Sequence, residues 1–271
     1  MTTLPARRSA SMTFARHAVT FAAWLVALSR AVGAQAAVLP FEVGERLEYQ
    51  VSVGRMGNIG KGAMWVDGLA DVRGCQTMVL RFELEAGKGP VRGSDKTRSW
   101  LDPQRMAALR FEKTERHPLS RHSESAELFP ETRLWVEAGG AAGQSPSGAP
   151  LDELSFIYFL RTISLAGDSV WRFDRHFDAA RNPTTIRVVG RRTLETAAGS
   201  FRTVQIEMRV HDPRRYKGEG IITIDLSDDR RRLPVRIESS MPVLGRTVLT
   251  LSAIRVTEAE ASVVAQRRGA R

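Results

Sequence analysis

The sequence has little cysteine and no apolar run long enough to cross a membrane. Its 271 residues include one cysteine, Cys75, so an internal disulfide is excluded and a hydrophobic core must hold the fold. The apolar run at residues 18–28 is short of the roughly 20 residues that a spanning helix needs, and Arg30 prevents its extension. We therefore expect no transmembrane segment in the mature chain, and packing rather than reactivity for Cys75.

The first 36 residues have the form of an export signal. Arg7, Arg8 and Arg16 provide a basic start, residues 18–28 are apolar, and residues 34–36 (Ala-Gln-Ala) have the small-x-small form that a signal peptidase cleaves. We expect cleavage near Ala36, which makes the mature protein periplasmic or otherwise exported.

Cleavage also changes the charge of the protein. Residues 1–36 hold four arginines and no acidic residue, so the formal net charge falls from +10 to +6. A mildly basic exported protein can attract anionic lipid head groups or acidic glycans. Nucleic acid is not an expected partner outside the cytoplasm.

Apolar and polar residues alternate through most of the remaining chain, which is typical of strands with one buried face. Leu47, Tyr49, Val51 and Val53 would share one face of such a strand. The pattern returns in residues 78–84, 204–210, 222–226 and 249–253. Because the links between these segments are short, antiparallel pairing is favoured. The sequence predicts a mainly β fold, with a curved antiparallel sheet or a partly open barrel.

A helix is predicted at about residues 150–163, where the alternation stops. Pro150 suits a helix start, Asp152 and Glu153 complement the positive N-terminus, and Arg161 lies near the negative end. Residues 154–160 are apolar except for Ser155, so the helix should be buried against the concave face of the sheet.

The domain organisation follows from these segments. We expect a signal peptide at residues 1–36, a single β-rich domain at 37–254, and a basic, disordered tail at 255–271. A glycine-rich stretch at 137–149 predicts a flexible loop within the domain.

Two sets of side chains have spacings that metal sites also use. Asp174, His176 and Asp178 would share one face of a strand, but apolar residues on the opposite face make a solvated strand face the better interpretation. His117 and His122 flank a turn without a recognised ligand pattern, which favours a surface pair over zinc. No metal or cofactor is expected.

The candidate catalytic residues also have structural explanations. Asp152 and Glu153 are adjacent, so they diverge on a helix, and helix-terminus stabilisation explains them better than paired acid–base catalysis. Ser155 lacks the glycine-flanked turn of a hydrolase nucleophile and should bond within its helix. The basic run at residues 230–232 follows a turn and is expected to be solvated.

Four segments together resemble a known family. They are Phe-Glu-Val-Gly-Glu-Arg-Leu-Glu-Tyr at 41–49, Leu-Ser-Phe-Ile-Tyr-Phe-Leu-Arg at 154–161, Thr-Leu-Glu-Thr-Ala-Ala-Gly-Ser-Phe at 193–201 and Asp-Arg-Arg-Arg-Leu-Pro-Val-Arg-Ile at 229–237. In this order, over about residues 41–254, the chain is similar to an exported bacterial family, domain of unknown function 3108 (DUF3108). The resemblance implies a β-rich exported protein without an established activity or known catalytic residues. In plan the chain is also similar to half-barrel lipoprotein carriers, in which a curved sheet wraps around a helix.

These observations lead to a binding function rather than an enzymatic one. One-sided strands and a helix too apolar for water predict an apolar groove for a lipid, an acyl chain or a protein segment, with Tyr49, Tyr158 and Arg161 as candidate cavity residues. The alternative is a structural or assembly factor that contacts envelope glycans or another envelope protein. A hydrolase is the third hypothesis, and the sequence leaves the oligomeric state open.

Overall fold

The computed structural model describes residues 38–88, 91–118, 120–167, 170–213, 218–241 and 245–256. By its contacts the chain divides into two units, Met1–Ala36 and Ala37–Arg271, and every described residue belongs to the second unit. The predicted signal and most of the predicted tail therefore lie outside the described residues. Among the described residues, no helix is long and apolar enough to cross a membrane.

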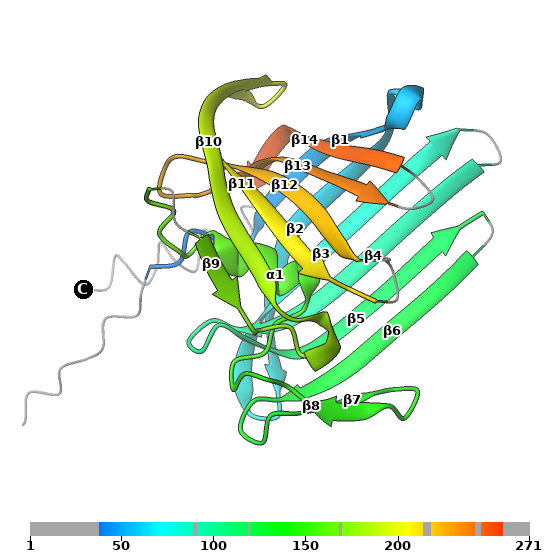
Figure 1. Cartoon of the computed structure of the whole chain (residues 1–271), viewed down its shortest axis with the longest axis vertical. Coiled ribbons are helices and arrows are strands. Elements are labelled where there is room, and N and C mark those ends of the chain that lie inside the picture. Colours follow the sequence, from blue (N-terminus) through cyan, green and yellow to red (C-terminus); the bar gives the residue numbers. More distant parts are fainter. Residues whose placement is uncertain are drawn as a thin grey trace, which may run out of the picture. The chain divides into compact units, whose positions relative to one another are not determined.

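Fourteen strands of the described residues form one antiparallel sheet in the order β8-β7-β6-β5-β4-β3-β2-β1-β14-β13-β12-β11-β10-β9 (Figure 1). The strands are β1 (Glu45–Val53), β2 (Asn58–Val72), β3 (Cys75–Lys88), β4 (Val91–Asp102), β5 (Ala107–His117), β6 (Ser120–Phe129), β7 (Leu134–Glu137), β8 (Ala142–Gln144), β9 (Val170–Phe173), β10 (Thr184–Thr196), β11 (Gly199–His211), β12 (Glu219–Ser227), β13 (Pro234–Met241) and β14 (Gly245–Val256). Nearly every strand pairs with its neighbour in the chain, and β1 pairs with β14. The end strands β8 and β9 do not pair with each other in the described structure, so the predicted curved sheet is confirmed and it is not closed into a barrel.

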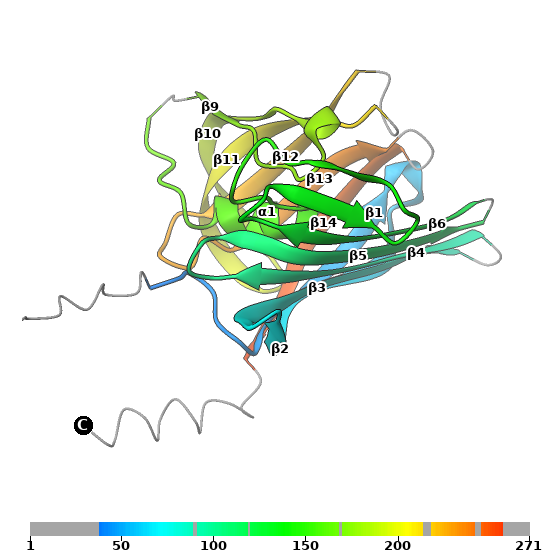
Figure 2. The ribbon, with the colours of Figure 1, turned by 90° about the horizontal axis from the view of Figure 1, so that it is seen from below.

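The core lies on the concave side of the sheet, around the helix α1 (Glu153–Leu160). On β1, Leu47, Tyr49, Val51 and Val53 are buried, as their alternation predicts. They belong to one apolar cluster with residues of α1 and of strands on both sides of β1 in the sheet. In Figure 2, α1 lies between β10–β13 on one side and β3–β5 on the other, so the predicted buried helix is confirmed.

The helix starts later than Pro150 because Asp152 caps it. The Asp152 carboxylate accepts hydrogen bonds from the backbone N–H groups of Leu154 and Ser155 (2.9 and 3.0 Å), and the Ser155 hydroxyl accepts one from the Asp152 N–H (2.9 Å). This reciprocal capping satisfies N–H groups that a helix start leaves unpaired. Pro150 stays outside the helix, where its carbonyl accepts from the Ala108 N–H (2.8 Å).

The stretch at 137–149, predicted as a loop, contains the short strand β8, which corrects the prediction over Ala142–Gln144. Gly143 explains the difference. A Cβ at this position would lie 2.7 Å from the indole ring of Trp135, so only glycine lets the backbone pack directly on that ring.

A second correction concerns the strand on which Asp174, His176 and Asp178 are predicted to share a face, because strand β9 ends at Phe173. The following residues, 174–182, form a strap across the gap between the two ends of the sheet. Asn182 shapes the strap because its side-chain amide donates to the carbonyls of His176 and Asp178 (2.9 and 2.8 Å). A single parallel bridge between Leu151 and His176 then ties the strap to the segment before α1.

We predict that Gly60→Ala destabilises the sheet, whereas Gly68→Ala on the same strand does not. A Cβ on Gly60 would lie 2.4 Å from the Glu85 carbonyl oxygen, but a Cβ on Gly68 meets nothing within 4 Å. Urea denaturation should show a loss of about 1–3 kcal/mol for Gly60→Ala, as overpacking costs, and a change within about 0.5 kcal/mol for Gly68→Ala. Equal stability of the two variants would contradict this packing.

We predict that the Asp152→Asn variant gains stability relative to the native protein as pH rises. Burial raises the pKa of the Asp152 carboxyl to about 6, against the opposing hydrogen bonds from Ser99 and Ser155. Since the folded state holds this proton more tightly than the unfolded chain, its stabilising contribution is lost as pH rises through the folded pKa. Asparagine keeps the capping oxygen without the ionisation, so the difference in unfolding free energy should shift by about 2–3 kcal/mol in favour of the variant between about pH 4 and about pH 7. The same difference at both pH values would refute the shifted pKa.

Candidate functional site

A cavity of about 230 Å³ lies between the concave face of the sheet and the N-terminal half of α1. Most of its wall is apolar, and the apolar side chains come from β2, β3, β11–β14 and α1, where alternation turns every second residue inward. They are Met64, Phe82, Leu84, Leu154, Phe156, Ile157, Met208, Val210, Ile222, Ile237 and Leu249, together with Leu151 in the segment before α1. The apolar wall is therefore supplied mainly by the sheet and the helix.

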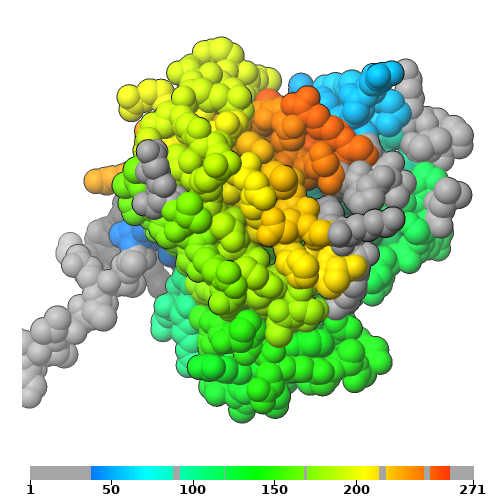
Figure 3. Space-filling model, viewed as in Figure 1, coloured from blue at the N-terminus to red at the C-terminus, as the bar shows by residue number. Residues whose placement is uncertain are grey.

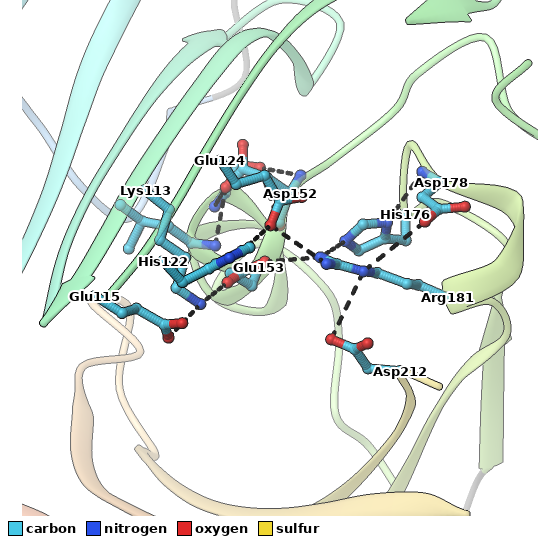
Figure 4. Close-up of polar contacts among 12 residues, drawn as sticks. Lys113, Glu115, His122, Glu124, Asp152, Glu153, His176, Asp178, Arg181 and Asp212 are labelled. Atoms are coloured by element: carbon cyan, nitrogen blue, oxygen red, sulfur yellow. Dashed lines mark hydrogen bonds and ion pairs between the residues drawn. The ribbon is translucent and has the colours of Figure 1, made fainter. Parts of the chain in front are cut away.

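Charged side chains also line the cavity, and Figure 4 shows several of them clustered around Glu153. They come from β4, β5, the start of α1, the strap and the end of β11. The charged side chains are Asp95, Lys113, Glu115, Asp152, Glu153, Arg181 and Asp212, and the histidines His176 and His211 lie among them. The helix α1 and strand β11 contribute to both kinds of wall, but β12–β14 contribute uncharged side chains, whereas β4, β5 and the strap contribute charged ones; we call this second side the charged end of the cavity.

Lys113 is the central cation on the β5 side. Its side chain is 9% exposed, and its ammonium group forms ion pairs with Glu115 (3.2 Å) and with Glu153 at the start of α1. A buried ammonium needs such partners because desolvation penalises an isolated charge.

Arg181 is the corresponding cation on the strap, and it connects elements on both sides of the gap. Its guanidinium lies within ion-pair distance of Glu124 on β6 (3.3 Å), Glu153 on α1 (3.5 Å) and Asp212 after β11 (3.6 Å), and of Asp178 (3.9 Å). Burial by itself would lower the pKa of Arg181, but the surrounding carboxylates raise it. In the space-filling view the segment from β9 to β12 meets the β6–β8 segment in this region (Figure 3).

His176 lies beside Arg181 and is neutral. Burial lowers its pKa to about 4, with a further contribution from the positive charge of Arg181. Its Nδ1 accepts a hydrogen bond from the Asp178 N–H (3.0 Å). The solvated strand face predicted for Asp174, His176 and Asp178 is thus wrong for His176 and Asp178, because the chain turns after Phe173; Asp174 alone is exposed.

The two histidines predicted as a loop pair lie on adjacent strands and have different partners. His117 on β5 is 3.4 Å from Asp95, and His122 on β6 is 3.7 Å from Glu124. Asp95, Glu115 and His117 place possible metal-ligand atoms within 4.8 Å of one another, the one such group among the described residues. The ammonium of Lys113 already pairs with Glu115, so a metal ion would have to compete with that cation.

The three predicted cavity residues are buried but do not line this cavity. Arg161 forms a two-pronged ion pair with Glu45 (2.6 and 2.8 Å), and the Tyr49 hydroxyl donates to the Pro234 carbonyl (2.9 Å). Tyr158 packs edge-on against Phe41, with 4.9 Å between ring centroids. The contacts of Tyr158 and Arg161 belong to the C-terminal end of α1, whereas the cavity lies beside its N-terminal half.

Sequence reasoning missed the charged residues that do line the cavity. Phe111, Lys113 and Glu115 share the buried face of β5, so that face changes from apolar to charged along a single strand. In the sequence such a change resembles the solvated end of a strand. One signal was available in the sequence: a lysine and a glutamate follow a buried phenylalanine at every second position, and so occupy the same face of the strand.

Comparison with solved structures finds matches at low sequence identity. A β-barrel-like protein of the DUF1849 domain from Brucella abortus is 12% identical, with a TM-score of 0.53 over 81% of this chain and 100% of that one. A protein from Bacteroides fragilis assigned as exported, with a YmcC-like fold, is 14% identical (TM-score 0.32; 80% and 97% covered). A protein from Parabacteroides distasonis assigned as a lipoprotein is 11% identical (TM-score 0.32; 80% and 97% covered). The likeness to the Brucella protein concerns the fold alone.

Sequence comparison identifies the family but not an activity. No curated protein matches the chain. The model of the family described as "Protein of unknown function (DUF3108)" matches residues 33–252, which is most of the chain and includes all four segments that resemble that family. The chain therefore belongs to the DUF3108 family.

Proposed function

We propose that this protein is a non-enzymatic, exported binding protein that holds the apolar chain of a lipid or another acyl-bearing molecule between its sheet and α1. The observation that carries the proposal is the apolar wall of the 230 Å³ cavity. An engineered apolar cavity of about 150 Å³ already binds benzene, and small-molecule pockets begin at about 300 Å³. The size therefore suits one narrow chain better than a bulky multi-ring ligand.

The partial exposure of apolar side chains in the cavity wall supports an apolar ligand. Phe82, Ile157 and Ile222 line the cavity and are only partly buried, although they lie on the inner side of the molecule. A bound chain would cover this surface and gain about 0.8 kcal/mol for each methylene group removed from water. A lipid, an acyl chain and an apolar protein side chain would all bury apolar surface in this way. Experimentally, the dependence of affinity on the length of the apolar chain distinguishes among them.

The polar groups near the cavity support binding rather than catalysis. The hydroxyls of Ser99 and Ser155 are both engaged with Asp152, the helix cap. The nearby His176 uses Nδ1 to accept a backbone hydrogen bond. These groups serve local structure, which favours binding over a hydrolytic function that would use Ser99 or Ser155 as its nucleophile.

The most direct test compares native mass spectra of the protein from an envelope fraction before and after organic extraction. We expect an additional mass that extraction removes, and rebinding when lipids or fatty acids are added. A ligand-free protein that ignores both would refute the proposal. Recovery of a specific envelope protein or glycan instead would support the assembly-factor alternative.

We predict that Ile222→Trp blocks binding and that Ile221→Trp does not. Ile222 lines the cavity, while its neighbour Ile221 is 46% exposed and lies outside the cavity lining. An indole at position 222 would occupy the space of the ligand. Displacement of a fluorescent apolar probe should show at least about tenfold weaker binding for Ile222→Trp, the loss expected when about 1.4 kcal/mol of contact is removed.

Thermal unfolding of both tryptophan variants provides the control, since both must remain folded. Equal binding by the two variants would place the ligand elsewhere.

A further inference from the structure

We propose that the charged end of the cavity binds the head group of the ligand, and that this head group is uncharged and carries hydroxyl groups. This inference rests on the proposed function and names the ligand class, a neutral hydroxyl-bearing amphiphile such as an acylglycerol. Lys113 and Glu153 are the residues that we assign to head-group specificity.

The first step is that the two ends of the cavity suit the two parts of one amphiphile. Ile237 and Leu249 of β13 and β14 contribute apolar wall, while Lys113 and Glu115 of β5 contribute charged wall to the same cavity. A chain lying along the apolar wall brings its polar end to the charged groups. Burying that end costs free energy unless it forms hydrogen bonds there.

The second step is that the cations at this end already have carboxylate partners. Lys113 pairs with Glu115 and Glu153, and Arg181 pairs with Glu124, Glu153 and Asp212. A ligand carboxylate or phosphate that binds Lys113 would have to displace a glutamate, and a ligand ammonium that binds Glu115 or Glu153 would have to displace Lys113. Either exchange leaves one protein charge without its partner in a buried setting, which is costly.

The third step is that a hydroxyl group avoids this exchange. A hydroxyl donates one hydrogen bond and accepts others, so it can donate to a carboxylate while it accepts from an ammonium. Figure 4 shows Lys113 and Glu115 on one side of Glu153, and Arg181 and Asp212 on the other. A head group with several hydroxyls can therefore bond to both sides and leave the ion pairs intact.

The experiment measures displacement of an apolar fluorescent probe by four ligands with the same chain: monodecanoyl glycerol, decanoate, decylamine and decane. For the native protein at neutral pH, we expect monodecanoyl glycerol to bind at least about tenfold more tightly than the other three. Tighter binding of decanoate or decylamine would overturn the inference, as would equal binding of decane and monodecanoyl glycerol.

Two variants test whether these ion pairs set the preference. Lys113→Gln removes the cation that pairs with Glu115 and Glu153, so decylamine should gain affinity. Glu153→Gln removes a carboxylate that pairs with both Lys113 and Arg181, so decanoate should gain affinity. Lys96→Gln is the matched control, because Lys96 also pairs with a glutamate (Glu83, 3.3 Å) but lies outside this cavity and is 56% exposed. A preference that stays unchanged in both cavity variants would overturn the inference.

The outcomes separate this inference from the proposed function. Binding of all four ligands without head-group preference preserves the apolar-chain site and removes the head-group assignment. If none of the four binds, both proposals fail.

Discussion

The gap between β8 and β9 is the constraint on which the arrangement of this protein depends. In a sheet that closes into a barrel, the backbone groups of the two end strands pair with each other. Here the two ends are instead linked by the Leu151–His176 bridge and by the ion pairs of Arg181. Partly buried charges need partners of opposite sign, and acidic side chains accordingly surround the two cations, Lys113 and Arg181. Around the cavity, β12–β14 consequently contribute uncharged wall, while the charged wall comes from β4, β5, the start of α1, the end of β11 and the strap at the gap.

The helix keeps the cavity open because both of its ends are fixed. With eight residues, α1 is too short to be stable by itself. Asp152 caps its start, while Arg161, fully buried, holds its end through Glu45 and the carbonyls of Pro40 and Arg231. Since neither end is free to slide toward the sheet, the space beside the N-terminal half is a preformed feature of the fold.

The sequence predicts the elements of this structure better than its site. Alternation on β1 identifies both the strand and its buried face, and a nearly all-apolar segment identifies the buried helix, because both patterns are local. Contacts such as Arg181 with Glu124, 57 residues apart, depend on how a curved sheet brings its ends together. Alternation also predicts which side chains point inward. It does not predict whether these side chains pack tightly or leave a cavity between them. For that reason Tyr49, Tyr158 and Arg161 were predictable as interior residues, and the position of the cavity was not.

An open sheet also has free edges, and their design bears on self-association. The end strands β8 and β9 have three and four residues, too few to template a long added strand. Strand β10 continues to Thr196 beyond its pairing with β9, which ends at Arg187, and so offers a longer free edge. That edge contains a bulge between Val188 and Gly190, followed by Arg191 and Arg192. An irregular backbone and adjacent positive charges oppose docking of another strand. This edge of the open sheet is therefore protected against strand-to-strand association with a second copy of the protein.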